Sequence, residues 1–169
     1  TGFLEGSGLE MFKGTIITNE FGETNLPDVY AAGDCAMVKN AMTGKATWSP
    51  MGSTANIAGR VIAQNMMGKK LSYRGVLGTA VCKLPEMNVG RTGLTEAQAK
   101  EEGFDPISVI AVVDDKAHYY PDASIFVIKM IADKATERLL GVQVIGSGAI
   151  DKVVDIAVTG IMLKATLTD

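Results

Sequence analysis

The clearest candidate for a chemical role is residues 24–34, TNLPDVYAAGD. Pro27 lacks an amide donor and suits the first position of a strand, and the short apolar run 29–32 is typical of a parallel strand buried on both faces. Gly33 allows another backbone or a ligand to approach closely. Asp34 then places a carboxylate at the carboxyl end of this predicted strand, where ligands of open α/β sheets bind. Such a carboxylate can accept a hydrogen bond from a sugar or polyol hydroxyl, so we predict a ligand contact at Asp34.

Together with the downstream string 48–56, WSPMGSTAN, this segment resembles the second flavin-binding motif of the FAD-dependent pyridine nucleotide-disulfide oxidoreductases. In that family the aspartate of the motif holds the ribityl chain of FAD. The resemblance therefore implies that Gly33 and Asp34 bind FAD. The alternative for residues 24–34 alone is an ordinary buried strand that ends in a turn, and the downstream string argues against it.

A helix is predicted after this motif, with Ser53 or Thr54 as its N-cap and Gly68 following its last residue, near Met67. The start of a helix carries unpaired amides and the positive end of the helix dipole. This end stabilises negative charge, which the N1/C2-carbonyl edge of a reduced flavin develops. The resemblance implies that Ser53, Thr54 and Ala55 lie against the flavin ring.

Two further places are candidate substrate contacts. Asn56 shares a helix face with Arg60, four residues later, and the resemblance implies that Asn56 contacts a thiol substrate. The string 117–121, AHYYP, resembles the branch of the family that contains coenzyme A-disulfide reductases and NADH oxidases. In those reductases a tyrosine at this motif reaches the partner subunit's thiol and coenzyme A, which implies a catalytic role for Tyr119 or Tyr120. The alternatives are a solvated helix face for Asn56 and core packing for the tyrosines, since one of two adjacent strand residues points inward.

Hydrophobic patterning and turn signals divide the chain near the polar joint 69–75. Before it we expect a short strand within 14–19 and a loop or the beginning of a helix in 37–48. After it we expect five strands and two helices, the first helix opened by a capping box, with strands at 77–83, 87–92, 107–113, 124–132 and 139–145 and helices at 95–102 and 149–164. Antiparallel strands with helices to one side make an α+β layer. The resemblance identifies 1–72 as an incomplete α/β segment of the FAD-binding domain and 73–169 as the dimerisation domain.

Composition narrows the function classes. The net charge is −3, with 47% hydrophobic and 21% charged residues, which is ordinary for a soluble globular protein. No basic cluster exceeds a pair and no apolar run approaches the roughly 18 residues of a membrane span, so neither nucleic acid nor a membrane is an expected partner. His118, the only histidine, cannot form a triad or a metal cluster, so no metal site is predicted. Cys35 and Cys82 form no C-x-x-C motif, and we expect them to be buried free thiols of a cytoplasmic protein.

The resemblance implies the C-terminal part of a homodimeric enzyme with FAD as cofactor and NAD(P)H as co-substrate. The resemblance further implies that such an enzyme would pass a hydride from the nicotinamide to the flavin, and then electrons through a cysteine outside this chain to a disulfide such as coenzyme A disulfide, to peroxide or to oxygen. The residues leave the acceptor open, as well as the choice between NADH and NADPH. They also leave open a non-enzymatic dimerisation or binding module that keeps the flavin-like strand only as packing.

Both ends of the enzyme are expected to lie outside this chain. The chain begins at Thr1 without a methionine, lacks the G-x-G-x-x-G motif that cradles a pyrophosphate, and stops at Asp169 before the Tyr-Ala-Pro-Pro-Phe-like tail of the resembling enzymes. Residues 151–155, DKVVD, also depart from the Lys-Arg pair common in that branch, so the second base of the pair is absent. We therefore expect the chain by itself to be inactive.

Overall fold

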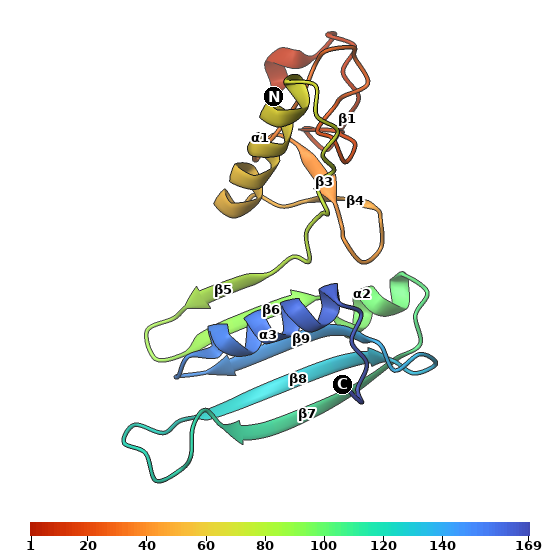
Figure 1. Cartoon of the computed structure of the whole chain (residues 1–169). Coiled ribbons are helices and arrows are strands. Elements are labelled where there is room, and N and C mark those ends of the chain that lie inside the picture. Colours follow the sequence, from red (N-terminus) through yellow and green to blue (C-terminus); the bar gives the residue numbers. More distant parts are fainter. The chain divides into compact units, whose positions relative to one another are not determined.

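The computed structural model describes residues 1–169, and the chain forms two units, Thr1–Val76 and Leu77–Asp169 (Figure 1). The predicted identities of the segments 1–72 and 73–169, an FAD-binding domain and a dimerisation domain, remain predictions.

The first unit is built around one helix and two small antiparallel hairpins, in which β1 pairs with β2 and β3 pairs with β4. Its elements in chain order are η1 (Gly2–Leu4), β1 (Met11–Phe12), β2 (Thr15–Ile16), β3 (Met37–Lys39), β4 (Ala46–Trp48) and α1 (Gly52–Met66). The strand expected within 14–19 is confirmed, over a shorter length, as β2.

Residues 37–48 form a hairpin, so the prediction of a loop or the beginning of a helix is wrong for this segment. The side chain of Asn40 accepts hydrogen bonds from the amides of Met42 and Thr43 at 2.9 and 3.2 Å. Gly44 follows with a φ of +72°, a backbone conformation that favours glycine. Both features are typical of tight turns, and this turn brings the two short strands into register.

Residues 29–32 do not form the predicted buried strand. Val29 is 37% exposed, and Asp28 before it has a φ of +61°, which interrupts extended backbone. Tyr30 makes a single antiparallel bridge with Glu23. A strand needs a neighbour along its length to satisfy its backbone groups, and within this chain no strand runs beside residues 29–32.

The end of α1 agrees with the prediction for Gly68. This glycine has a φ of +85°, and its amide donates to the carbonyl of Asn65 at 2.9 Å. The amide of Lys69 donates to the carbonyl of Gln64 at 3.1 Å. The two bonds make a Schellman motif, which satisfies carbonyls at the end of the helix. The expected helix end is confirmed.

The second unit is an antiparallel five-stranded sheet in the order β5-β6-β9-β8-β7, with two helices. Its elements are β5 (Ala80–Lys83), β6 (Asn88–Gly93), α2 (Glu96–Glu101), β7 (Pro106–Asp114), β8 (Ile125–Asp133), β9 (Leu139–Gly146) and α3 (Ile150–Met162). The predicted α+β class and all of these elements are confirmed, with small differences at their ends. None of the helices in the chain has the length and apolar character needed to cross a bilayer.

α3 covers one face of this sheet, against β6 and β9 (Figure 1). Ile150 and Val154 of α3 form a buried cluster with Phe126 and Val144 of the sheet. Gly90 of β6 makes this close approach possible. A Cβ at that position would lie 2.6 Å from Cγ2 of Val154 and 2.9 Å from Cδ1 of Ile150.

α2 is held on the opposite face of the sheet. Ile128 packs against the cluster beneath α3, so its neighbour Lys129 points to the other face. There the Nζ of Lys129 lies 2.8 Å from a carboxylate oxygen of Glu96 in α2, and the hydroxyl of Ser108 donates to the same oxygen at 3.0 Å. These contacts, Lys129 first, lower the pKa of Glu96 to about 2. One detail of the predicted fold therefore differs, because the helices lie on opposite faces and not on one side.

The capping box predicted for α2 is present. The hydroxyl of Thr95 accepts a hydrogen bond from the amide of Gln98 at 3.2 Å, and the Gln98 side chain accepts one from the amide of Thr95 at 3.0 Å. Gly103 follows the helix with a φ of +86°. Both ends of this short helix are thus set by local sequence.

Both cysteines are free and exposed, so the prediction of buried thiols is wrong for this chain. Cys35 lies in the turn after Asp34, and Cys82 lies on β5, an edge strand of the sheet. No other element of the chain covers either side chain.

We expect Gly90→Ala to lower the free energy of unfolding of the second unit by about 1–3 kcal/mol, because the added methyl group overpacks the contact between α3 and β6. Urea unfolding of the two proteins measures this difference. Gly160→Ala is the matched control within α3. The added Cβ would lie 3.6 and 3.7 Å from side-chain atoms of Leu139 and Ala165, which are ordinary contact distances. The free energy of unfolding should therefore stay the same or increase. Unchanged stability of Gly90→Ala would contradict the packing argument.

Candidate functional site

Gly33 and Asp34 lie in a turn whose backbone is anchored on both sides. Gly33 has a φ of +86°, and its carbonyl accepts a hydrogen bond from the amide of Ala36 at 3.0 Å. The amide of Ile16 donates to the carbonyl of Cys35 at 2.7 Å. The side chain of Asp34 is exposed, and its carboxylate has no hydrogen-bond or ion-pair partner in the chain. The turn thus presents a free acceptor on a fixed backbone.

α1 begins without a side-chain cap. Its N-cap is Met51, which makes no side-chain capping bond, so the predicted caps at Ser53 or Thr54 are wrong. The amide of Ala55 donates to the carbonyl of Met51 at 3.0 Å, and the amides of Gly52 and Ser53 before it have no acceptor within the helix. These free donors and the positive end of the dipole stabilise a neighbouring negative charge.

The side chain of Thr54 points into the unit and away from solvent. It is 7% exposed, its hydroxyl lies 3.0 Å from that of Ser49, and it also hydrogen-bonds to Tyr73. A ligand at the start of α1 would therefore meet the backbone of Thr54 and not its hydroxyl.

The fold brings the Gly33 turn and the first turn of α1 together. A Cβ on Gly33 would lie 3.9 Å from the Cβ of Ala55, an ordinary van der Waals distance. The predicted cofactor residues Gly33, Asp34, Ser53, Thr54 and Ala55 therefore form one region of the first unit. An exposed acceptor and free amide donors in one region suit a ligand that carries both a hydroxyl and an electron-rich polar edge.

Trp48 and Ser49 also belong to this region, although the sequence by itself indicates no separate role for either residue. The indole N–H of Trp48 donates to the backbone carbonyl of Asp34 at 2.9 Å, while the indole itself is 57% exposed. The signal that could have found them is the pair of short runs 37–39 and 46–48, separated by a turn that contains asparagine and glycine.

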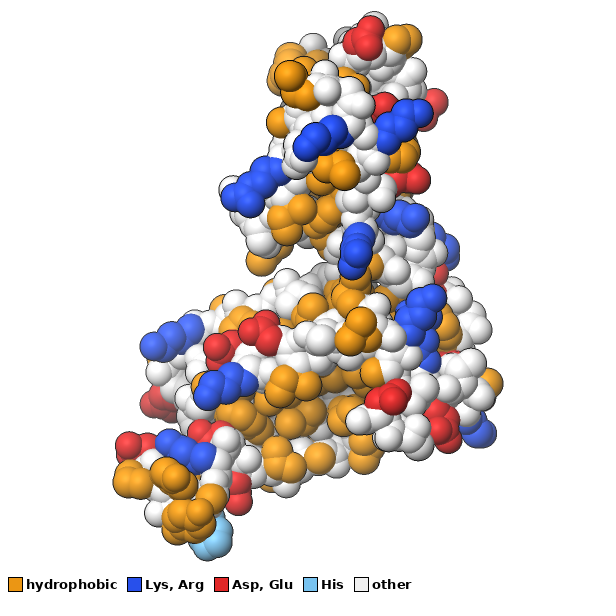
Figure 2. All heavy atoms as spheres, viewed as in Figure 1, with side chains coloured by type: hydrophobic (Ala, Val, Ile, Leu, Met, Phe, Trp, Pro, Cys, Tyr) orange, Lys and Arg blue, Asp and Glu red, His pale blue; other side chains and the backbone are white.

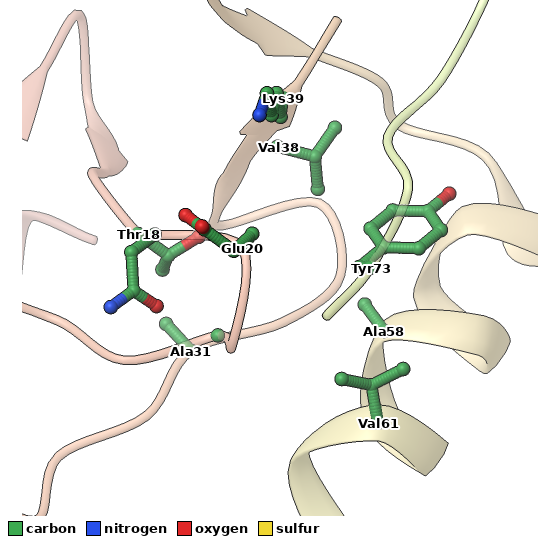
Figure 3. Close-up of a pocket in the computed structure, with 10 residues that line it drawn as sticks. Thr18, Glu20, Ala31, Val38, Lys39, Ala58, Val61 and Tyr73 are labelled. Atoms are coloured by element: carbon green, nitrogen blue, oxygen red, sulfur yellow. The ribbon is translucent and has the colours of Figure 1, made fainter. Parts of the chain in front are cut away.

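The enclosed pocket beside α1 is too small for a cofactor (Figure 3). Ala58 and Val61 of α1 line it together with Val38 and Tyr73. Its volume is about 10 Å³, which is room for one water molecule. Burial raises the pKa of Tyr73, and the hydrogen bond with Thr54 opposes this effect. This pocket is therefore not a candidate cofactor site.

Tyr119 and Tyr120 lie in the loop between β7 and β8, and both are exposed, by 76% and 56%. Core packing is thus the wrong interpretation within this chain. The ring of Tyr119 lies 5.2 Å from that of Tyr120 and 5.8 Å from that of His118, centroid to centroid. The base of the loop is closed by Asp115, which accepts a 2.7 Å hydrogen bond from the amide of Ser124. This bond holds the pKa of Asp115 below its usual value.

Asn56 and Arg60 are both exposed on α1, in keeping with their predicted shared face. The side chain of Asn56 has no hydrogen-bond partner in the chain. A substrate contact and a solvated helix face both fit this position, and the substrate role remains a prediction. Tyr119 and Tyr120 belong to the second unit, whereas Asp34 and Asn56 belong to the first.

Residues in each of the two units match models of one protein family. Residues 79–169 match the model of the pyridine nucleotide-disulphide oxidoreductase dimerisation domain, and residues 1–58 match the pyridine nucleotide-disulphide oxidoreductase model. The chain belongs to the pyridine nucleotide-disulphide oxidoreductase family. The resemblance carried by residues 24–34 and 48–56 is confirmed at the level of the family.

Curated relatives and solved structures agree with this assignment. The chain is 40% identical, over 92% of its length, to the NAD(P)H coenzyme A polysulfide/persulfide reductase of Pyrococcus horikoshii and covers 35% of that protein. It is 31% identical, over 95% of its length, to an NADH oxidase of Methanocaldococcus jannaschii and covers 36% of it. The structure of an NAD-dependent persulfide reductase from A. fulgidus matches 99% of the chain with a TM-score of 0.93 and 35% identity, and the chain covers 31% of that protein. The chain thus spans about a third of the length of these relatives.

Proposed function

We propose that this pyridine nucleotide-disulphide oxidoreductase chain acts as part of a larger FAD-dependent enzyme that oxidises NAD(P)H. The observation that carries the proposal is the unpartnered carboxylate of Asp34 beside the uncapped start of α1. Family membership supports it, as do relatives named as NAD(P)H-dependent reductases and NADH oxidases. A module that kept this region only for packing would not need an exposed carboxylate beside free helix amides.

Each part of this region has a distinct task in the proposal. Asp34 accepts a hydrogen bond from a ribityl hydroxyl of FAD and fixes the cofactor's chain. The free first-turn amides of α1, those of Gly52 and Ser53, and the helix dipole stabilise negative charge on the polar edge of the flavin ring. When bound, the flavin supplies the hydride and electron chemistry, while the protein orients it.

The proposed electron acceptor is a sulfur–sulfur bond, as in coenzyme A disulfide or a persulfide. In support, the relatives at 40% identity are named as coenzyme A-dependent sulfur reductases, whereas the NADH oxidases are less similar, at 28–33%. Asn56 on α1 is the proposed contact to the thiol substrate. Tyr119 and Tyr120 are the proposed donors to a thiolate or to coenzyme A in the other subunit of a dimer.

The test uses the full-length enzyme that contains this chain. We expect the purified enzyme to carry about one FAD per subunit and to oxidise NAD(P)H faster when coenzyme A disulfide or a persulfide is added. The absorbance spectrum measures the FAD content, and the loss of NAD(P)H absorbance measures the rate of oxidation. If the enzyme turns over with oxygen alone, the electron acceptor is oxygen and not a sulfur–sulfur bond. An enzyme without flavin and without NAD(P)H oxidation would support a non-enzymatic module.

The proposed assembly is a homodimer formed through the second unit. β7 is an edge strand with apolar side chains exposed on both of its faces, since Val109 is 56% exposed and Ile110 and Val112 are each 65% exposed. Figure 2 shows hydrophobic side chains gathered over the visible face of this unit. Large apolar side chains exposed on an edge strand in this way are typical of a protein interface.

We expect light scattering to show a dimer at micromolar concentration, with an interface on the order of 2,000 Å² or more. Val112→Glu should shift the protein toward monomer, because the new carboxylate would lie opposite the apolar Val127 and would be buried without a partner. Met67→Glu, at a similarly exposed apolar position after α1, is the control and should leave the dimer intact. A monomeric wild-type protein would rule out this assembly.

A further inference from the structure

We propose that Trp48 and Ser49, consecutive residues at the end of β4, are positioning residues that set the spacing between the Asp34 turn and the first turn of α1. The inference rests on the proposed function, in which FAD contacts both of these places. Neither residue is assigned a contact with the cofactor. Their task is to hold the two contacting elements at a fixed distance.

The contact on the Asp34 side is the indole of Trp48. Its N–H donates to the backbone carbonyl of Asp34 at 2.9 Å, on the residue that carries the free carboxylate. The indole is 57% exposed, so burial of apolar surface explains little of its presence there. A buried tryptophan would be a packing residue, whereas an exposed one with its donor directed at a single carbonyl restrains that carbonyl.

The contact on the helix side is the hydroxyl of Ser49. It lies 3.0 Å from the hydroxyl of Thr54, which is buried in the first turn of α1. The carbonyl of Ser49 also accepts a hydrogen bond from the amide of Met51 at 2.8 Å. Because α1 has no side-chain cap at Met51, its first turn needs another anchor, and Ser49 supplies it while leaving the first amides free.

β4 provides a rigid base for both contacts. Its three residues pair in register with β3, where Met37 lies opposite Trp48 and Val38 lies opposite Thr47. Met37 and Val38 are both buried, at 8% exposure. Trp48 and Ser49 therefore extend from a strand that is fixed to the core of the unit. A shift of the hairpin would move the carboxylate and the helix start together, and loss of either bond would let them move apart.

A ligand that spans two contacts is sensitive to their spacing, because sites must be held within about 0.5 Å of the productive geometry. Loss of either hydrogen bond should therefore weaken binding without removing a group that touches the cofactor. We expect Trp48→Phe and Ser49→Ala each to raise the dissociation constant for FAD by roughly 3- to 10-fold, which corresponds to one modest hydrogen bond. Ser49→Thr keeps the hydroxyl and should restore most of the affinity.

The experiment is a fluorescence titration of the full-length apoenzyme with FAD, together with the thermal unfolding of each apoprotein. Asp34→Ala is included alone and combined with Trp48→Phe. If Trp48 acts through Asp34, the effect of Trp48→Phe shrinks in the Asp34→Ala background, since residues that share one interaction are not additive. Phe12→Leu, at an exposed aromatic position with no bond to Asp34, should leave the dissociation constant unchanged.

The outcomes separate this inference from the proposed function. Unchanged FAD affinity in Asp34→Ala would overturn the proposed function and this inference with it. Weakened binding in Asp34→Ala with unchanged affinity in Trp48→Phe and Ser49→Ala would overturn this inference alone. Additive effects of Trp48→Phe and Asp34→Ala, or lower thermal stability with unchanged FAD affinity, would show a merely structural role for Trp48 and would also overturn it.

Discussion

Asp34→Ala is expected to weaken FAD binding by the full-length enzyme roughly 10- to 150-fold, the worth of a hydrogen bond to a charged group. The carboxylate of Asp34 has no partner within the chain, so its removal leaves no other group unpaired and should not disturb the fold. The loss should therefore appear in cofactor affinity and occupancy and leave stability of the apoenzyme nearly unchanged. Equilibrium titration with FAD and the flavin content of the purified protein measure it.

Two variants make the interpretation of Asp34→Ala specific. Asp34→Asn keeps an acceptor oxygen without the charge, so its affinity for FAD should lie between those of the wild type and the alanine variant. Glu5→Ala removes another exposed carboxylate of the same unit and should leave FAD affinity unchanged. If Asp34→Ala binds FAD as tightly as the wild type, the proposed cofactor site is in the wrong place.

Tyr119→Phe or Tyr120→Phe is expected to slow thiol-dependent turnover of the full-length enzyme roughly 10- to 1,000-fold, with flavin content unchanged. A phenol hydroxyl can donate a hydrogen bond to a thiolate or oxyanion as its charge develops. Loss of such a donor lowers the reaction rate by a factor of this order. Both hydroxyls are on exposed rings, so the substitution removes no buried contact of the chain. Steady-state rates with coenzyme A disulfide and the absorbance spectrum measure turnover and flavin content.

The matched control for the tyrosines is Tyr30→Phe, the same chemical change at a half-buried tyrosine of the first unit. It should leave turnover with the disulfide unchanged. The electron transfer from NAD(P)H to the flavin should also be the same in all three variants, because the tyrosines are proposed to act on the thiol side. Full turnover in both Tyr119→Phe and Tyr120→Phe would leave these residues without a role in the reaction.

Local signals in the sequence predicted the second unit well. Thr95 and Gln98 form the expected capping box, and the apolar runs that predict strands coincide with β7, β8 and β9. These features depend on neighbours a few residues away, so the sequence contains them in readable form. What local patterning could not predict is the face on which each helix packs. The bond from Lys129 to Glu96 joins residues 33 positions apart and places α2 opposite α3.

Predictions failed in the first unit where contacts beyond the local sequence decide the structure. The apolar run 29–32 has the composition of a buried strand, but strand formation requires a neighbouring backbone, and no strand of this chain runs beside it. Ser53 and Thr54 have good capping side chains, but the helix begins one residue after Met51. Thr54 is drawn inward by Ser49 and Tyr73, and those contacts outweigh the capping preference.

By itself, the sequence determined the family of this protein, its α+β second unit and the residues that form the candidate flavin site. A binding motif is defined by residue types at short spacings, and residues 24–34 and 48–56 contain both. Only the tertiary structure decided that Gly33 lies against Ala55, that Trp48 donates to the carbonyl of Asp34 and that Ser49 holds Thr54. The physical reason is that these contacts depend on the turn at Asn40–Gly44 and on the packing of β3 and β4, which fix distances between residues up to 22 positions apart.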